Sequence, residues 1–292
     1  RAYRLFEAAL TACTDEDALA PAVDLCRRRY REAAEALQDR LLKSVEKEGW
    51  PPEGVPRQTG VFDEHVKPAL ERREKTAFFL VDSLRYEMGR DLAEALEGAG
   101  GVALSHAAVV PPTVTPTGMA ALMPGANGAL RLVESGGGLA PSLGDRVLSG
   151  SQDRMKLLAE IYGDRFAETT LDDLLGALPK KLSAKLEGID LFVVRTQDPD
   201  AIAENLGPWR ARRYLSEVVG DIAAAVRKVK NLGFTYVVIG ADHGHVMLSE
   251  SAPGDVVQSP PGAWLESKRR CRLGSGLAGG PGTMTFKAGH VG

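Results

Sequence analysis

The sequence from Phe234 to His245 reads Phe-Thr-Tyr-Val-Val-Ile-Gly-Ala-Asp-His-Gly-His. Its β-branched and aromatic half is typical of a buried strand in a parallel sheet, and Gly240 ends that pattern. In open α/β sheets, ligands bind just beyond the carboxyl ends of the strands. Asp242 and His243 stand where such a site would begin. Their carboxylate and imidazole suit zinc or a similar divalent ion, although a plain strand-end turn explains Asp-His-Gly equally well.

The composition is that of an ordinary globular protein. The chain has 292 residues, 44% hydrophobic and 26% charged, enough for one large domain or for one domain with a small appendage. The net charge of -3 shows no overall excess of basic residues of the kind that indicates nucleic-acid binding, although a local basic patch is still possible. Three separated cysteines, Cys13, Cys26 and Cys271, form neither a metal-ligand pair nor a disulfide framework. We expect a cytoplasmic protein without a membrane span, and a piece of a longer chain, because it begins at Arg1 and stops at Gly292 in mid-motif.

The first 75 residues predict an N-terminal helical segment. Apolar residues recur every three or four positions up to about residue 48, residues 51–60 read as a linker, and one more short helix is expected at 65–73. The polar face of the long helix carries five arginines: Arg27, Arg28, Arg29, Arg31 and Arg40. We interpret them as a solvated helix face, with a face that follows phosphates as the alternative.

From residue 76 onward, apolar runs alternate with helical patterns, as in a layered α/β domain. Besides the opening stretch, strands are predicted at residues 76–82, 102–110 and 189–194. Helices are predicted between them, notably from 85 to 96 and from 214 to 231. Residues from about 126 to 188 break this rhythm, and we expect them to form a cap insertion over one end of the sheet.

Several of the apolar runs are followed by a residue that can bind a metal or attack a substrate. Asp82 ends the run that begins at residue 76, Thr115 follows the run at 102–110, and Asp200 with Glu204 follows the run at 189–194. Because the carboxyl ends of parallel strands share one edge, such residues can meet in space. Each also has an ordinary explanation: Asp82 and Asp200 as helix caps, Glu204 as a first-turn residue, and Thr115 as part of a proline-rich turn.

Taken together, the motifs resemble the alkaline phosphatase superfamily and, within it, the PglZ domain of bacterial phage-defence systems. Val81–Arg85 resembles the first metal-ligand motif of the family, Thr115–Gly125 its nucleophile motif, and Gly240–Gly244 its Asp-His metal pair. The resemblance covers residues 76–292. It implies an alkaline phosphatase-like, mostly parallel sheet between helical layers. The helical segment 1–75 contributes nothing to the resemblance.

The resemblance also implies a reaction in which Thr115 attacks phosphorus with the help of two divalent cations. Zinc is the first expectation, with Mn²⁺ or Mg²⁺ as alternatives because Glu204 stands where many relatives have histidine. The ligands expected for one cation are Asp82, Asp242, His243 and the Thr115 oxygen. The ligands expected for the other cation are Asp200, Glu204 and His290. Two further side chains are candidates for contacting a phosphate oxygen, Arg85 and His245.

These expectations favour a metal-dependent phosphodiesterase or nuclease acting on nucleic acid or a nucleotide. The second hypothesis is an interaction module of a defence or signalling complex, with a degenerate metal site and the N-terminal helices as a docking arm. A third hypothesis is a phosphomonoesterase, since the same kind of site serves both reactions. The sequence does not choose among substrates, metals or oligomeric states.

Overall fold

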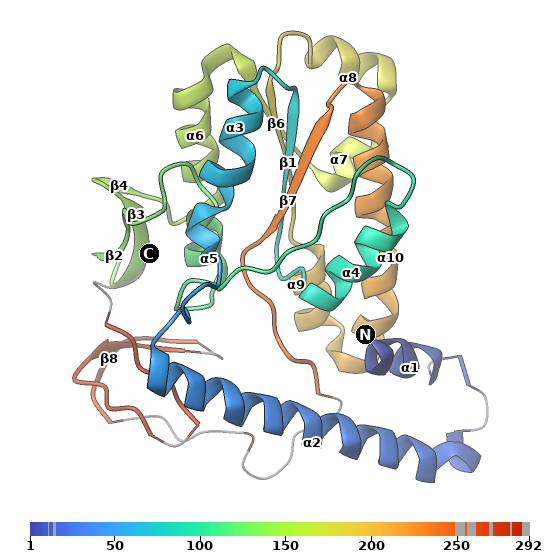
Figure 1. The fold of residues 1–292 in the computed structure, drawn as a ribbon, viewed down its shortest axis with the longest axis vertical. Coiled ribbons are helices and arrows are strands. Elements are labelled where there is room, and N and C mark those ends of the chain that lie inside the picture. The colour runs from blue at the N-terminus through green and yellow to red at the C-terminus, as the bar shows by residue number, and fades with distance from the viewer. Residues whose placement is uncertain are drawn as a thin grey trace.

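The computed structural model describes residues 1–10, 12–13, 16–248, 255, 261–268, 271–280 and 282–287. Its centre is a four-stranded parallel sheet with the strand order β5-β6-β1-β7 (Figure 1). The strands are β1 (Thr76–Val81), β5 (Phe166–Thr170), β6 (Leu191–Thr196) and β7 (Tyr236–Ala241). The predicted α/β class with a parallel sheet is therefore confirmed.

Helices cover both faces of this sheet (Figure 1). One layer holds α4 (Tyr86–Ala95), α7 (Leu171–Gly176), α8 (Pro179–Lys185) and α10 (Gly207–Asn231), with α9 (Asp198–Asn205) beside α10. The other layer holds η2 (Phe62–Val66), α3 (Lys67–Glu71), α5 (Thr115–Ala121) and α6 (Ser151–Tyr162).

The two layers follow from the alternation of side chains along β1. Phe79 and Val81 pack into the layer of α4 and α10, whereas Phe78 and Leu80 pack into the layer of α5 and α6. A central strand buried on both faces needs apolar residues at successive positions, and all six residues of β1 are buried. By contrast, β7 is the last strand of the sheet in the described part of the chain. The expectation that its residues are fully buried is wrong, because among them only Gly240 is buried.

The expected strand at residues 102–110 is also wrong. The segment belongs to no strand of the sheet, and Ala108 makes a single parallel bridge to Arg57. Val102 and Leu104 leave 44% and 42% of their surface exposed, so no second layer covers the start of the segment. A run of β-forming residues favours an extended backbone without specifying a strand partner.

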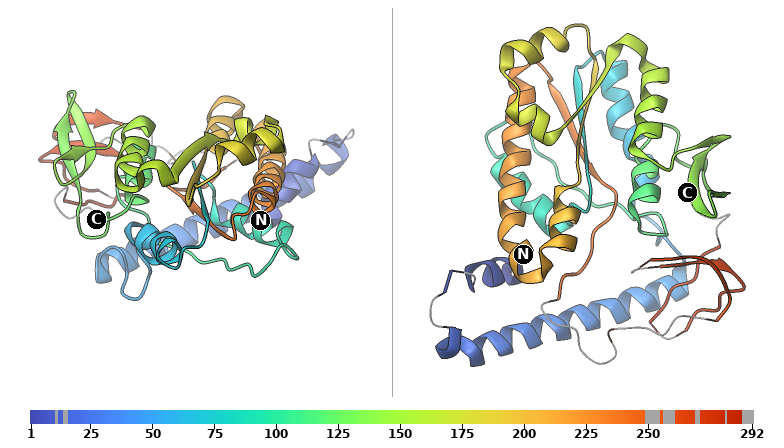
Figure 2. Two further views of the ribbon diagram at one scale, coloured as in Figure 1. Left: turned by 90° about the horizontal axis from the view of Figure 1, so that it is seen from above. Right: turned by 180° about the vertical axis from the view of Figure 1, so that it is seen from behind.

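Residues 126–188 are not a single cap. They begin with a small antiparallel sheet of β2 (Leu130–Ser135), β3 (Gly138–Leu143) and β4 (Arg146–Val147). After α6 and a short turn, η3 (Gly163–Arg165), they supply β5, which is a strand of the main sheet itself. The small antiparallel sheet lies on the outer side of the layer of α5 and α6, and Leu130 of β2 is buried in the core of that layer (Figure 2).

The N-terminal segment is helical, as predicted, with α1 (Ala2–Leu10) and the long α2 (Glu16–Glu48) ahead of η1 (Gln58–Gly60). Helix α2 runs below the edge of the sheet at which β1 and β7 end (Figures 1 and 2). A hairpin of β8 (Ala263–Ser267) and β9 (Arg272–Ser275) lies near its carboxyl end. No helix within the described ranges is both long enough and apolar enough to cross a membrane.

Candidate metal centre

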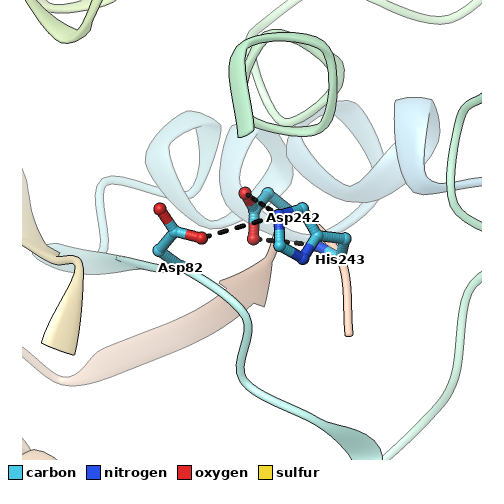
Figure 3. Close-up of side chains that lie close together, drawn as sticks. All are labelled: Asp82, Asp242 and His243. Carbon is cyan, nitrogen blue, oxygen red and sulfur yellow. Dashed lines mark hydrogen bonds and ion pairs between the residues drawn. The ribbon is translucent and has the colours of Figure 1, made fainter. Parts of the chain in front are cut away.

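The carboxyl ends of two neighbouring strands bring Asp82 and Asp242 together. Strands β1 and β7 are paired in a register that sets Val81 opposite Ala241, so the residue that follows each strand lies at the same level. His243 comes next in the chain and turns its ring toward the two carboxylates (Figure 3). This is the convergence at the edge of a parallel sheet that the sequence predicts.

The three side chains form a compact cluster of metal-ligand atoms. One ligand atom from each of Asp82, Asp242 and His243 lies within 4.8 Å of the other two. His243 Nε2 is 3.7 Å from Asp82 Oδ1 and 3.4 Å from Asp242 Oδ2. All three residues are buried, with at most 3% of their surface exposed. Within the described residues this is the one group of three or more such side chains that meets the spacing.

Thr115 adds a hydroxyl to this cluster. It is the first residue of α5, and its Oγ1 donates to Asp82 Oδ1 at 3.4 Å and lies 3.3 Å from His243 Nε2. Helix α5 can come this close because Gly118 has no side chain. A Cβ at Gly118 would lie 2.3 Å from the backbone oxygen of Asp242.

Hydrogen bonds fix the orientation of the Asp242 carboxylate. Its Oδ1 accepts from the backbone N–H of Ser83 at 2.9 Å and from that of His243 at 2.8 Å. Ser83 holds a left-handed backbone conformation, with φ 59°, and its Oγ lies 2.9 Å from His245 Nδ1. The two segments that follow β1 and β7 are thus bonded to each other, and the site is preorganised by backbone groups.

The pair of carboxylates is costly to ionise in the absence of a cation. Burial, followed by the negative charges of Asp242 and Asp200, raises the pKa of Asp82 to about 8. Burial also raises the pKa of Asp242 to about 6, although the N–H groups of Ser83 and His243 oppose this rise. Two buried carboxylates at this spacing need either a shared proton or a cation.

The donor set fits a divalent cation. Two carboxylate oxygens and an imidazole nitrogen match the ligands that zinc and manganese accept in proteins. Asp242 Oδ2 is buried and has no hydrogen-bond partner among the described residues, so it is an acceptor with unused capacity beside His243 Nε2. Asp82 is not the cap of α4, since that helix begins after Arg85 and has no side-chain cap. The alternative explanation of Asp82 as a helix cap is therefore wrong.

Several of the predicted site residues line a cavity next to this cluster. Thr115, Asp200, Glu204 and His245 line one cavity of about 950 Å³. Asp200 is half-buried in α9, near enough for its charge to act on Asp82, whereas Glu204 is exposed. Neither joins the cluster of three ligands.

Arg85 does not share that placement. The Arg85 guanidinium pairs with Glu87 at 2.7 Å, and Arg85 is not among the residues that line the cavity. Its side chain packs beside Gly244, where a Cβ would lie 3.5 Å from Arg85 Cγ. His290 lies outside the described residues. The roles of all these side chains remain predictions.

Two residues near the site give no signal in the sequence. Gln58 is buried and donates its amide to the backbone oxygens of Ala241 and Asp242 at 2.8 and 2.6 Å, while its Oε1 accepts from Val110 N–H at 3.1 Å. Arg154 of α6 is buried as well. Burial lowers its pKa to about 10, and the nearby carboxylate of Asp242 opposes that shift. Gln58 stands in an apparent linker and Arg154 in an amphipathic helix, so only the fold reveals them.

A parallel sheet with helices on both faces, carrying an Asp and an Asp-His pair at neighbouring strand ends, defines an alkaline phosphatase-like domain. The chain belongs to the family described as the BREX system PglZ alkaline phosphatase-like domain, whose sequence model matches residues 61–292. The match thus includes η2 and α3 and begins earlier than residue 76. A relative from Bacillus cereus (strain H3081.97), named alkaline phosphatase-like protein PglZ, is 24% identical over 301 residues. That alignment covers 99% of this chain and 34% of the relative, so the chain spans about a third of the relative's length.

Proposed function

We propose that this domain is a metal-dependent phosphoester hydrolase with Thr115 as its nucleophile, acting on phosphodiesters of nucleic acid or of a nucleotide. The observation that carries the proposal is the Thr115 hydroxyl, 3.3 to 3.4 Å from two members of a buried cluster of three ligand atoms. A nucleophile that touches a cation site is the arrangement expected for metal-assisted phosphoryl transfer.

The proposed reaction gives each residue of the site a separate role. Asp82, Asp242 and His243 would hold a divalent cation, which when bound lowers the pKa of a neighbouring hydroxyl and offsets the negative charge of a phosphate. Thr115 Oγ1 would form a bond to phosphorus as its proton passes to solvent and the bond from phosphorus to the leaving-group oxygen breaks. Water cleaves the resulting phosphothreonine ester, which releases the phosphate product and restores the hydroxyl.

A second cation is part of the proposal, with Asp200, Glu204 and His290 as its ligands. The support is that Asp200 and Glu204 line the same cavity as Thr115. Since two of these three ligands are carboxylates, Mn²⁺ or Mg²⁺ suits this position as well as zinc does. Two cations would clamp both the attacking and the leaving oxygen of an in-line displacement.

The cavity and the family support the choice of substrate and setting. A volume of about 950 Å³ is of the size that accommodates a nucleotide or the end of a nucleic-acid strand. The family is described by its place in the BREX system, and from it we take phage defence in the cytoplasm as the setting. His245 also lines the cavity, where its ring can donate to a phosphate oxygen.

The test is hydrolysis of bis(4-nitrophenyl) phosphate by the purified protein with Zn²⁺ or Mn²⁺, with 4-nitrophenyl phosphate as the monoester comparison. We expect the diester to be the better substrate and Thr115→Ala to lose turnover by on the order of 10³-fold or more. Thr115→Ser, which keeps the hydroxyl, is the matched control and should retain activity. Unchanged turnover in Thr115→Ala would rule out Thr115 as the nucleophile, and a faster monoester reaction would favour a phosphomonoesterase.

A second candidate is an interaction module of a defence complex. It is favoured by α2, whose Leu19, Leu25, Leu37 and Leu41 each leave at least 40% of their surface exposed. Metal analysis separates the two candidates. Two cations bound per folded chain support the hydrolase, whereas a folded protein that binds none supports the module.

A further inference from the structure

A buried ion pair between Glu7 and Arg212 joins helix α1 to helix α10. Neither residue is a predicted metal ligand. Arg212 of α10 is the largest fully buried side chain in the described part of the protein, with 2% of its surface exposed. Its Nη1 lies 3.8 Å from Oε2 of Glu7 on α1, and Glu7 is 1% exposed. A buried guanidinium is costly unless a carboxylate compensates its charge, and Glu7 supplies such a carboxylate.

The same guanidinium reaches the segment that carries the metal ligands. Arg212 Nη2 donates a buried hydrogen bond of 3.1 Å to the backbone oxygen of Met247. Met247 belongs to residues 242–248, an irregular stretch after β7 that begins with Asp242 and His243 and includes His245. Because this stretch belongs to no helix or strand, side-chain bonds of this kind fix its path.

Helix α1 is held firmly enough to act as a support for Arg212. The Tyr3 ring stacks on Tyr30 of α2 with centroids 3.8 Å apart, and the Arg212 guanidinium lies 5.4 Å from the Tyr3 ring on α1. The Tyr3 hydroxyl donates to Glu7 at 2.5 Å, and Arg27 of α2 donates to the same carboxylate at 3.1 Å. Residues from α1, α2 and α10 thus meet around Glu7.

We infer that the two N-terminal helices, which precede the residues matched by the family model, help to hold the metal centre in its geometry. In this arrangement Glu7 fixes Arg212, and Arg212 is a positioning residue that sets the path of residues 243–248 and with it the places of His243 and His245. The inference rests on the proposed function in so far as those two histidines serve the metal centre. Helix α2 extends the same support, since Gln38 lines the cavity beside Thr115 and Arg31 pairs with Asp255 at 2.8 Å.

The chain offers a matched control in Arg4. This arginine is also buried, also belongs to α1, and bonds to Glu87, Asp91 and Ser216, none of which lies in residues 242–248. Arg4→Met therefore removes ion pairs of α1 while Glu7, Arg212 and the bond to Met247 stay in place. Arg212→Met removes that bond and keeps a long apolar stem in the space.

The test compares Arg212→Met, Glu7→Gln and Arg4→Met in the full chain. It measures amide hydrogen exchange over residues 243–248, the Kd for Mn²⁺ and Zn²⁺ by calorimetry, and thermal unfolding. We expect Arg212→Met to speed exchange in this segment and to weaken metal binding about 10- to 100-fold, the usual effect of losing a group that supports a ligand. Glu7→Gln should do the same to a smaller degree. Arg4→Met should lower the unfolding temperature with the Kd within about twofold of wild type.

Two results would overturn the inference. One is an Arg212→Met protein whose segment 243–248 exchanges like wild type and binds metal equally well. The other is equal weakening of metal binding by Arg4→Met, because the effect of Arg212→Met would then come from loosening α1 and not from losing the bond to Met247. If Arg212→Met does not fold, Glu7→Gln, which leaves Arg212 in place, gives the same comparison. A wild-type protein that binds no metal defeats the proposed function instead, and the exchange measurement still decides this inference.

Discussion

At the scale of single residues, the acidic pair formed by Asp82 and Asp242 suits metal binding but lowers the stability of the metal-free protein. Asp82 and Asp242 are both buried, and burial raises the pKa of each carboxyl above its ordinary range. A fold selected only for stability has no reason to place two carboxylates side by side in its interior. We therefore expect the pair to destabilise the metal-free protein and to stabilise the metal-bound form.

The substitution Asp242→Asn tests this balance. The asparagine Oδ1 keeps the hydrogen bonds from the backbone of Ser83 and His243, while one buried negative charge is removed. We expect the metal-free unfolding temperature at pH 8 to rise by about 2–4 °C, and the rise that Mn²⁺ gives the wild type to disappear. Differential scanning calorimetry measures both effects. Asp145→Asn, at an exposed position, is the control and should change neither. A less stable Asp242→Asn protein that still responds to Mn²⁺ would contradict the account.

At the scale of elements, apolar runs predict the inner strands well and the others poorly. β1 and β6 are nearly or wholly buried, so their sequences are continuous apolar runs that can be recognised locally. β5 reads Phe-Ala-Glu-Thr-Thr and is half-buried throughout, so its place beside β6 is decided by pairing rather than by its own pattern. Residues 102–110 show the reverse, since their pattern suits a strand but in the described structure they form only one bridge, from Ala108 to Arg57.

The meeting of Asp82 with Asp242 and His243 could be predicted because strand ends of a parallel sheet share an edge. The supporting contacts could not. Gln58 joins β7 to the residues before Thr115 from a segment that looks like a linker, and no local pattern indicates a contact across 184 positions of the sequence. The closeness of Gly118 to Asp242 is likewise a tertiary contact, visible only once α5 is packed on β7.

Gly118→Ala tests the packing of α5 against the end of β7. The new Cβ would lie 2.3 Å from the Asp242 backbone oxygen, so α5 must move away and take Thr115 with it. We expect a loss of about 1–3 kcal/mol in the free energy of unfolding and a fall in diester turnover on the order of 10²-fold. Chemical denaturation and the nitrophenyl assay measure these quantities.

Gly220→Ala is the matched control for this change. Gly220 lies in the exposed part of α10, and a Cβ there would meet nothing within 4 Å. Alanine at a helical position should stabilise the protein by up to about 1 kcal/mol and leave turnover unchanged. If Gly118→Ala behaved like Gly220→Ala, close packing of α5 on Asp242 would not be needed for the site.

At the scale of the whole molecule, the acidic pair links stability to pH. In the folded, metal-free protein the pKa of Asp82 is about 8 and that of Asp242 about 6, both above the ordinary value of about 3.9. The folded chain therefore binds more protons than the unfolded chain. The resulting stabilisation is complete below about pH 4 and is lost as the pH rises through 6 and then 8.

Metal binding should show the opposite trend over the same range, because a cation has to displace those protons. We expect the rise in unfolding temperature on adding Mn²⁺ to the chelator-treated protein to be small at pH 5 and to grow up to pH 8. At a concentration about 100 times the Kd it should reach on the order of 4 °C. Calorimetry between pH 5 and 8.5 measures this, with Asp82→Asn as the variant in which the pH dependence should flatten. A metal response that is equal at pH 5 and pH 8 would contradict the assignment of these two carboxylates as ligands.

Crystals grown with Zn²⁺ show whether Asp82, Asp242 and His243 bind one cation together, through an anomalous difference map recorded at the zinc absorption edge. We expect a peak in contact with Asp82 Oδ1, Asp242 Oδ2 and His243 Nε2, with the Thr115 oxygen beside it. A map with no peak among these atoms, or with zinc bound only elsewhere on the protein, would show that the three residues are not a metal site.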